Sequence, residues 1–356
     1  MTLPPHLTIK DGHLRIGGLD TTGLAERFGT PLYITDIDRI TANYLGWQEA
    51  LTSRYKSSRV LFAAKANGNP YVLRTLAGLG AGADVFSAGE LELALAAGIP
   101  SGKLLFNGSS KSPGDLALAV EKKVKVSVDS MDELHQLDAC AGETGETAEI
   151  AFRVNPALEV PTHPKIATGL ASSKFGISHD QIAGSYKEAL SCEHIRPVGV
   201  HCHIGSQILS VEPFARAAEV MMKVSAELTE LGVRLEFVDI GGGLGIPYRH
   251  GHEVAPTFAQ YADAVVPVFL KGLTAAGIRP ELWVEPGRSV VGDSTILVTR
   301  VNSVKRAHRN FANVDAGFNL LIRPVMYDSY HEVVAADRAD GHPDRPYTIA
   351  GPICET

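Results

Sequence analysis

The sequence has few cysteines, no long apolar run and little excess charge, and each shortage excludes a class of protein. Its four cysteines contain no CxxC pair and are too few for a disulfide framework, which favours a reducing cytoplasm. No apolar run approaches the roughly 18 residues of a membrane-spanning helix, and the first residues lack the pattern of a secretion signal. We therefore expect a cytoplasmic protein without a membrane anchor.

The charge balance argues against nucleic acid or an anionic membrane as a partner. The chain has 33 basic and 40 acidic residues, so its formal net charge is −7. Hydrophobic residues make up 45% and charged residues 21% of the 356 residues, which is the usual mix of a globular protein. This length predicts roughly two domains.

Short β-rich segments alternate with helical patterns through the middle of the chain. Eight such segments begin near Arg59, Gly82, Lys103, Lys125, Glu149, Val198, Phe237 and Glu281. The first five starts are 21 to 24 residues apart, a spacing that suits one strand, one helix and two short loops. The pattern predicts an α/β fold with a (β/α)8 TIM barrel over residues 31–290, and an open doubly wound sheet is the alternative.

Local signals mark the expected helix starts and a second domain. Four serines resemble capping boxes because each is followed three residues later by an acid or an amide; they are Ser87, Ser112, Ser130 and Ser178. Residues 1–30 carry a hairpin signal, and residues 291–356 read as strands without helices. We predict a β-rich domain built from both chain ends, which we expect to be incomplete at its C-terminus.

Functional groups of a parallel barrel gather at the carboxyl ends of its strands. Lys65 ends the first predicted strand, where its amine is a candidate for a Schiff base with a carbonyl compound. Asp84 follows the second strand, and we include it among the cofactor-binding candidates. Arg153 ends the fifth strand, where a buried arginine needs an acidic partner or an anionic ligand.

Two histidines, His201 and His203, end the sixth strand and share one face of it. Two interpretations stay open for them. The pair is spaced for metal ligation, or one flat imidazole lies against an aromatic cofactor ring. Further metal ligands are not evident in the sequence, so we expect no metal.

The last two strands lead into a glycine run and an acid. Gly241, Gly242 and Gly243 permit positive φ and let backbone N–H groups converge on an anion, which predicts a phosphate site. In the segment Glu285–Arg288, the carboxylate is placed for a protonated ring nitrogen, Gly287 adds an N–H, and Arg288 suits a carboxylate or phosphate. A reactive lysine, a phosphate site, a stacking group and such an acid together are what pyridoxal 5′-phosphate requires.

Eight segments extend this interpretation to a family. They are FAAKAN, GADVFSAGEL, THPKIATGLASSKFGI, HCHIGSQ, DIGGGLGI, EPGRS, VDAGFNLLIRPVMYDSYH and GPICE. In order and over nearly the whole chain, they resemble the diaminopimelate decarboxylases. This is a family of fold-type III pyridoxal-phosphate enzymes, like the ornithine and arginine decarboxylases and alanine racemase. The resemblance implies decarboxylation of meso-2,6-diaminopimelate to L-lysine and carbon dioxide, the last step of lysine biosynthesis.

The resemblance also implies roles for individual residues. Lys65 would carry the cofactor, His203 would stack on its ring, and Glu285 would pair with the ring nitrogen. The phosphate would be held by Ser206, Gly241, Gly242, Gly243, Gly287 and Arg288. The distal end of the substrate would be bound by Arg288, Arg323 and Tyr327.

The same family implies a homodimer whose sites are shared between subunits. Cys354 would enter the site of the other subunit as proton donor, and Glu355 would contact the substrate ammonium there. Family members continue for several tens of residues past GPICE and supply a further tyrosine to the site, so we expect the chain to be truncated.

Three alternatives stay open. A decarboxylase of ornithine, arginine or a carboxylated polyamine would use the same lysine and glycines, although Arg288 and Arg323 favour a substrate with a distal carboxylate. A truncated copy that binds the cofactor without catalysis is the second. A metal-dependent hydrolase using His201 and His203 is the third.

Overall fold

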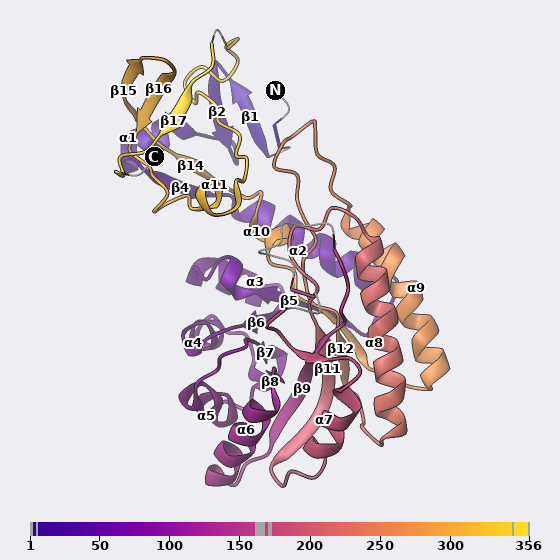
Figure 1. Ribbon diagram of the computed structural model, residues 1–356. Helices are drawn as coiled ribbons and strands as arrows, with labels where there is room; N and C mark the ends of the chain where they lie inside the picture. Colours follow the sequence, from indigo (N-terminus) through magenta and orange to yellow (C-terminus); the bar gives the residue numbers. More distant parts are fainter. Residues whose placement is uncertain (1–2, 5, 161–167, 170–172, 344, 355–356) are drawn as a thin grey trace. The chain divides into compact units, whose positions relative to one another are not determined.

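The computed structural model describes residues 3–4, 6–160, 168–169, 173–343 and 345–354. The chain divides into two compact units. One comprises Thr41–Ile246 and Ala255–Gly292, and the other comprises Met1–Ile40, Pro247–Val254 and Asp293–Thr356. Helix α2 (Ile37–Thr52) carries the chain from the second of these into the first (Figure 1).

The larger unit is a closed parallel barrel, which confirms the predicted fold and excludes the open sheet. Its strands follow one another in sequence order around the ring, and the β13–β5 and β8–β9 pairings close it. A short strand, β10 (Ile177–Ser178), extends the sheet beside β9. The barrel strands are β5 (Ser58–Ala63), β6 (Gly82–Val85), β7 (Leu104–Phe106), β8 (Lys125–Val128), β9 (Ala148–Asn155), β11 (Ile195–Cys202), β12 (Phe237–Asp239) and β13 (Glu281–Val284).

Helices connect successive strands and lie around them (Figure 1). They cover the outer face, so the strands are buried on both sides and read as nearly continuous apolar runs. The helical segments of this unit are η1 (Ala64–Ala66), α3 (Pro70–Gly78), α4 (Ala88–Ala96), η2 (Ser101–Lys103), α5 (Pro113–Glu121), α6 (Met131–Thr144), α7 (Ile182–Ala189), α8 (Glu212–Glu230), α9 (Phe258–Ala276) and α10 (Arg288–Val291).

Three of the four predicted serine caps are confirmed. Ser87, Ser112 and Ser130 are the N-caps of α4, α5 and α6, and each side chain accepts the backbone N–H three residues on. The prediction for Ser178 is wrong: this residue belongs to β10, and α7 begins at Ile182 after Gln181, which makes no side-chain cap. The spacing alone did not reveal that the serine pairs with β9 instead.

The barrel interior is filled by apolar side chains from its strands. A buried cluster contains Leu61, Leu105, Ala151, Val198, Phe237 and Trp283. The rings of Phe237 and Trp283 stack with centroids 3.8 Å apart. Gly199 provides the room for this pair, because a Cβ atom there would lie 2.2 Å from the Phe237 ring. The barrel is therefore a packed core, with its polar groups at the strand ends.

The smaller unit is β-rich, as predicted, but the expectation of strands without helices after residue 291 is wrong, because a short helix lies over Arg323–Tyr327. At Asp11 and Gly12, where φ is +55° and +79°, the chain makes the tight turn expected between its first two strands. Its elements are β1 (Leu7–Lys10), β2 (His13–Ile16), β3 (Leu19–Asp20), α1 (Thr21–Phe28), β4 (Leu32–Thr35), β14 (Thr295–Val298), β15 (Val301–Arg306), β16 (Asn310–Val314), α11 (Arg323–Tyr327) and β17 (Thr348–Ala350). β14 pairs antiparallel with β4, which joins segments from both chain ends.

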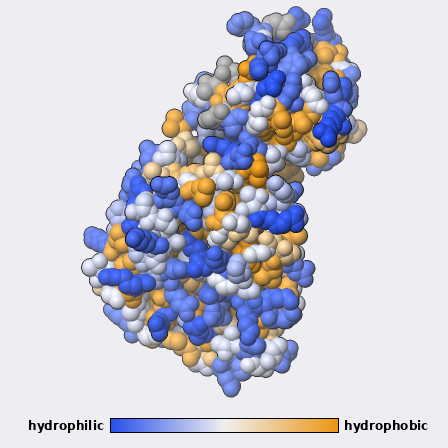
Figure 2. Space-filling view, turned by 180° about the vertical axis from the view of Figure 1, so that it is seen from behind, coloured by the Kyte–Doolittle hydropathy of each residue, from blue (hydrophilic) through white to orange (hydrophobic). Residues whose placement is uncertain are grey.

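Polar side chains are interspersed with apolar ones on the face shown in Figure 2. Among the described residues, no helix combines the length and the apolar character that crossing a membrane requires.

The close contact at Gly199 predicts the effect of one methyl group. Gly199→Ala should lower the free energy of unfolding by about 1–3 kcal/mol, because the Phe237 ring has to move to admit the methyl. The matched control is Gly78→Ala in α3, where nothing lies within 4 Å of an added Cβ; it should raise stability, by less than about 1 kcal/mol. Urea unfolding followed by fluorescence measures both, and equal effects would contradict the packing described here.

Candidate active site

Polar residues stand at the carboxyl ends of all eight barrel strands. In chain order they include Lys65, Asp84, Asn107, Asp129, Arg153, His201, Asp239 and Glu285. The closed ring of strands brings these ends to one mouth of the barrel, where the active sites of such barrels lie. The sequence positions predicted for the lysine, the histidines, the glycines and the acid therefore fall on one face of one unit.

Lys65 forms an ion pair with Asp84. Its Nζ lies 2.7 Å from Oδ2 of Asp84, and it also lies 3.7 Å from the centre of the Phe86 ring. The lysine side chain is 43% exposed, whereas the aspartate is completely buried. The Lys65 amine is thus held by the buried Asp84 carboxylate and remains accessible to solvent.

A buried amide, Asn107, joins Asp84 to Glu285. Its Nδ2 donates hydrogen bonds of 2.6 Å to Oδ1 of Asp84 and 2.6 Å to Oε1 of Glu285. Burial on its own would raise the pKa of Glu285, but His201 and Lys65 outweigh it and lower that pKa to about 2. Burial and the nearby Glu285 charge raise the pKa of Asp84. Glu285 is therefore held in its charged form although it is buried.

The two histidines have different neighbours and do not act as a pair. His201 Nδ1 lies 2.8 Å from Oγ of Ser127, and its Nε2 lies 3.3 Å from Oε2 of Glu285. His201, Asp239 and Glu285 each offer one donor atom within 4.8 Å of the others, as a metal site would require. Burial and the Glu285 charge raise the pKa of Asp239 well above its usual value.

His203 is fixed as a neutral imidazole. Gly242 donates its backbone N–H to Nδ1 of His203 over 3.2 Å. Burial and the charges of Arg153 and Lys65 lower the pKa of His203 well below its usual value. An imidazole that accepts at Nδ1 carries its proton on Nε2, so a flat, uncharged ring is presented at the barrel mouth.

The glycine run packs too closely for any side chain. Gly241 and Gly243 have φ of +73° and +116°, which favours glycine. An added Cβ would lie 2.5 Å from Cys202 O at Gly241, 2.0 Å from Glu285 O at Gly242 and 2.2 Å from Gly205 O at Gly243. The turn therefore admits only glycine, and no side chain of its own covers the backbone that would face an anion.

The other predicted phosphate contacts lie in the same unit. Nη2 of Arg288 donates to Oγ of Ser206 over 3.1 Å, and its Nε donates to the same oxygen over 3.3 Å. An added Cβ at Gly287 would lie 3.0 Å from the Cβ of Ala66, next to Lys65. The loop after β13 thus approaches the lysine segment closely.

These residues fit pyridoxal 5′-phosphate. A lysine amine accessible at the barrel mouth suits its aldehyde, the bare glycine turn suits its phosphate, and the neutral His203 ring suits its aromatic face. Glu285, ionised although buried, suits a protonated ring nitrogen.

The remaining predicted residues lie in the smaller unit. Arg323 and Tyr327 are the first and last residues of α11, and Cys354 is exposed near the end of the described chain. Arg323 donates to Oγ of Ser329 over 3.2 Å and lies 4.2 Å above the Tyr248 ring. Glu355 lies outside the described residues.

Sequence reasoning missed the polar groups after the third and fourth strands. Asn107 follows β7 directly, and Asp129 follows β8. Asp129 supplies the strongest favourable charge on the buried Arg153, which provides the acidic partner expected for that residue. Nearby, Lys111 is fully buried and forms a 2.8 Å ion pair with Glu133. The rule that indicated Lys65 and Glu285 also applies to these two strand ends and would have found both residues.

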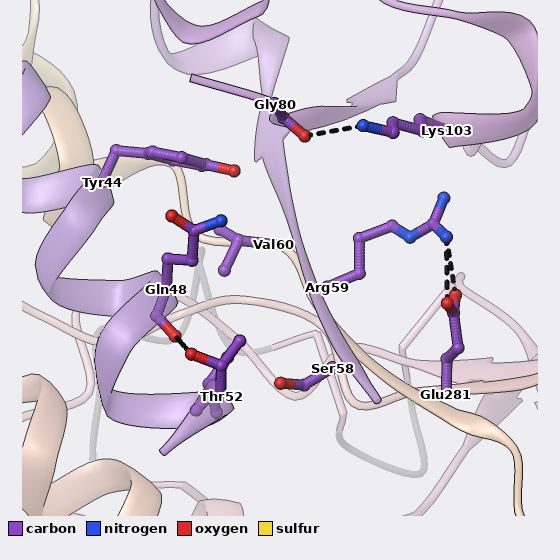
Figure 3. A pocket seen from close by; sticks show the side chains of 10 residues that line it. Tyr44, Gln48, Thr52, Ser58, Arg59, Val60, Gly80, Lys103 and Glu281 are labelled. Carbon is purple, nitrogen blue, oxygen red and sulfur yellow. Dashed lines mark hydrogen bonds and ion pairs between the residues drawn. The ribbon is translucent and has the colours of Figure 1, made fainter. Parts of the chain in front are cut away.

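A pocket lies at the opposite, amino end of the barrel strands (Figure 3). It encloses about 170 Å³ and is lined by the starts of β5 and β13 and by part of α2. Arg59, the second residue of β5, and Glu281, the first of β13, form an ion pair of 2.9 Å. Polar pairs at this end of a barrel stabilise the fold and do not form the active site.

Comparisons with known proteins show a similarity to pyridoxal-dependent decarboxylases. The family described as "Pyridoxal-dependent decarboxylase, pyridoxal binding domain" matches residues 37–292. A diaminopimelate decarboxylase from Archaeoglobus fulgidus is 47% identical over 346 residues, which cover 97% of this chain and 81% of that protein. One from Methanothermobacter thermautotrophicus is 40% identical over 355 residues, covering 99% and 82%.

Solved structures show the same similarity. The diaminopimelate decarboxylase of Methanocaldococcus jannaschii in complex with L-lysine matches with a TM-score of 0.92 at 39% identity, over 99% of this chain and 82% of that one. The lysine decarboxylase of Selenomonas ruminantium matches with a TM-score of 0.79 at 26% identity, over 96% and 84%. A structure of SrLDC in complex with PLP has a TM-score of 0.80 at 26% identity, over 96% and 84%.

The environment of His203 predicts its protonation state. We expect a neutral ring with the proton on Nε2 at about pH 6 and above, because burial and nearby cations oppose the charged form. Nitrogen-15 NMR of histidine-labelled protein measures this, and His203→Gln assigns the signal. An imidazolium signal for His203 at about pH 6 would contradict the assignment.

Proposed function

The chain belongs to the pyridoxal-dependent decarboxylase family, and from this premise we propose that it converts meso-2,6-diaminopimelate to L-lysine and carbon dioxide. The observation that carries the proposal is the barrel mouth, where Lys65 pairs with Asp84 and Glu285 is held ionised. The 36–47% identity to proteins named diaminopimelate decarboxylase, over most of both chains, supports this substrate. Pyridoxal 5′-phosphate is the cofactor.

When bound, the cofactor supplies an electron sink for the electron pair released as carbon dioxide leaves. Lys65 would bond to its aldehyde carbon, and Asp84 orients the amine for this. Glu285 would hold the proton on the ring nitrogen, and His203 would lie flat against the ring. Ser206, Gly241, Gly242, Gly243, Gly287 and Arg288 would hold the phosphate.

Recognition of the substrate is assigned to arginine and tyrosine side chains. Diaminopimelate ends in an ammonium and a carboxylate, and Arg288, Arg323 and Tyr327 would bind this distal end. An arginine guanidinium suits a carboxylate. A substrate whose distal end is only an amine would instead require an acidic side chain at that end. The lower identity of the lysine decarboxylase, 26%, also favours diaminopimelate over a basic amino acid.

We propose a homodimer that shares its sites. Cys354 would deliver the proton to the former α-carbon in the site of the other subunit, and Glu355 would contact the substrate ammonium there. The thiol of Cys354 is exposed on the single chain, as a group that reaches into another subunit has to be. The described cysteines are free thiols, which supports a reducing compartment, the cytoplasm.

Lys65 gives the most direct test of the reaction. Purified protein with added cofactor should release carbon dioxide from diaminopimelate and not from ornithine, arginine or lysine. Lys65→Ala should lower kcat by at least about 100-fold. Lys65→Arg is the matched control, because it keeps the charge beside Asp84 without an amine that bonds to the aldehyde; it should be as inactive. Turnover of ornithine but not diaminopimelate would overturn the proposed substrate.

Mixing two inactive variants tests the shared site. Lys65→Ala and Cys354→Ala, unfolded together and refolded, should form heterodimers in which one of the two sites is intact. Random pairing would restore about a quarter of the wild-type activity. Each variant refolded alone is the control, and a mixture that stays inactive would show that the site is not shared.

A further inference from the structure

The barrel mouth contains a buried amide to which the reaction assigns no role. Asn107 is completely buried between two carboxyl groups that are also buried, Asp84 and Glu285. It donates one N–H to each, over 2.6 Å in both cases. Both bonds are short for N–H···O contacts, as expected when the acceptor is charged.

The orientation of this amide is determined by its partners. Both neighbours present oxygen atoms, so the NH2 group has to face them. Its carbonyl oxygen, Oδ1, is buried and has no hydrogen-bond partner among the described residues. Leaving a buried acceptor unpaired costs stability, so a purely structural role explains this arrangement poorly.

The two carboxyl groups need a donor between them. Buried carboxyls that face each other tend to share one proton, because like charges in a low-dielectric site repel. Burial and Glu285 indeed raise the pKa of Asp84, while the Asn107 hydrogen bond acts to lower it. The other titratable or charged groups acting on the pair are Lys65, Asp239, His201 and His203, together with Arg153.

We propose that Asn107 is a positioning residue that keeps Asp84 and Glu285 ionised at the same time, so that Asp84 serves the Lys65 amine and Glu285 serves the ring nitrogen of the cofactor. One N–H group satisfies each carboxylate, which leaves the second oxygen of Asp84 for Lys65. On Glu285, the second oxygen faces His201. The inference rests on the proposed function.

Two substitutions separate charge from shape. Asn107→Leu keeps the size of the side chain and removes both donors. Asn107→Asp keeps the shape and replaces the NH2 group with an oxygen that donates only while it is protonated. Both variants are loaded with pyridoxal 5′-phosphate labelled with nitrogen-15 in the ring, and its chemical shift reports the ring proton. Cofactor affinity is measured by fluorescence.

In the wild-type holoenzyme the ring nitrogen should stay protonated from about pH 6 to about pH 8. Asn107→Leu should lower the apparent pKa of the ring nitrogen by at least one unit, which is about a tenfold change in the protonation equilibrium. Asn107→Asp should also lower this pKa, because a carboxyl group has at most one hydrogen to donate and can serve only one of the two carboxylates, so that the other takes up a proton. The value of kcat should fall with the ring proton, with little change in KM.

Asn43→Leu is the matched control. Asn43 is also a buried amide of this unit, and it donates to the Val290 carbonyl over 2.9 Å. Its replacement should lower stability and leave the ring-nitrogen signal unchanged.

A ring nitrogen that stays protonated to about pH 8 in both Asn107 variants, with cofactor affinity within about threefold of the wild type, would overturn this inference alone. A wild-type protein that releases no carbon dioxide from diaminopimelate would instead overturn the proposed function. If Asn107→Leu does not fold, the pH response of the isosteric Asn107→Asp decides the question.

Discussion

The site depends on how the charges of buried carboxyl groups at the mouth of the barrel are compensated. Three carboxyl groups, Asp84, Asp239 and Glu285, are buried where an isolated ion would be strongly destabilised. Their surroundings raise the pKa of Asp84 and of Asp239 and lower that of Glu285. Asp239 has its pKa raised and accepts the backbone N–H of Gly241 over 2.7 Å, so it orders the glycine turn without needing a charge. Glu285 stays ionised because cationic and N–H groups surround it.

The fold was predictable because its signal repeats. Eight strands, the first five of them at regular spacing, leave few topologies, and buried parallel strands read as apolar runs whichever helix covers them. Local details were less predictable. Ser178 has the spacing of a capping box but pairs with β9, and residues 247–254 lie between two barrel segments yet belong to the smaller unit. Both depend on contacts between residues distant in sequence, which spacing does not reveal.

The site was predictable where the residue type alone indicates a chemical role. A lysine, a triple glycine and a glutamate at strand ends are unusual enough to be noticed, and Lys65, the glycines and Glu285 lie in one barrel mouth. Asn107 was missed because an asparagine before a glycine reads as an ordinary turn. Only the structure shows that it contacts two carboxyl groups. The two histidines could not be separated either, because their roles depend on Ser127 and Gly242, which are far from them in the sequence.

The barrel mouth by itself does not determine which amino acid is decarboxylated. A lysine decarboxylase shares this fold at 26% identity, so the choice of substrate has to come from groups that meet its distal end. Arg323 is suited to this because it is ordered in advance: it lies over the Tyr248 ring and donates to Ser329 and towards His331. A guanidinium that is already held in place loses little conformational entropy when it binds a carboxylate. Under the function proposed above, selectivity for a second carboxylate would follow from the rigidity of this arginine as much as from its charge.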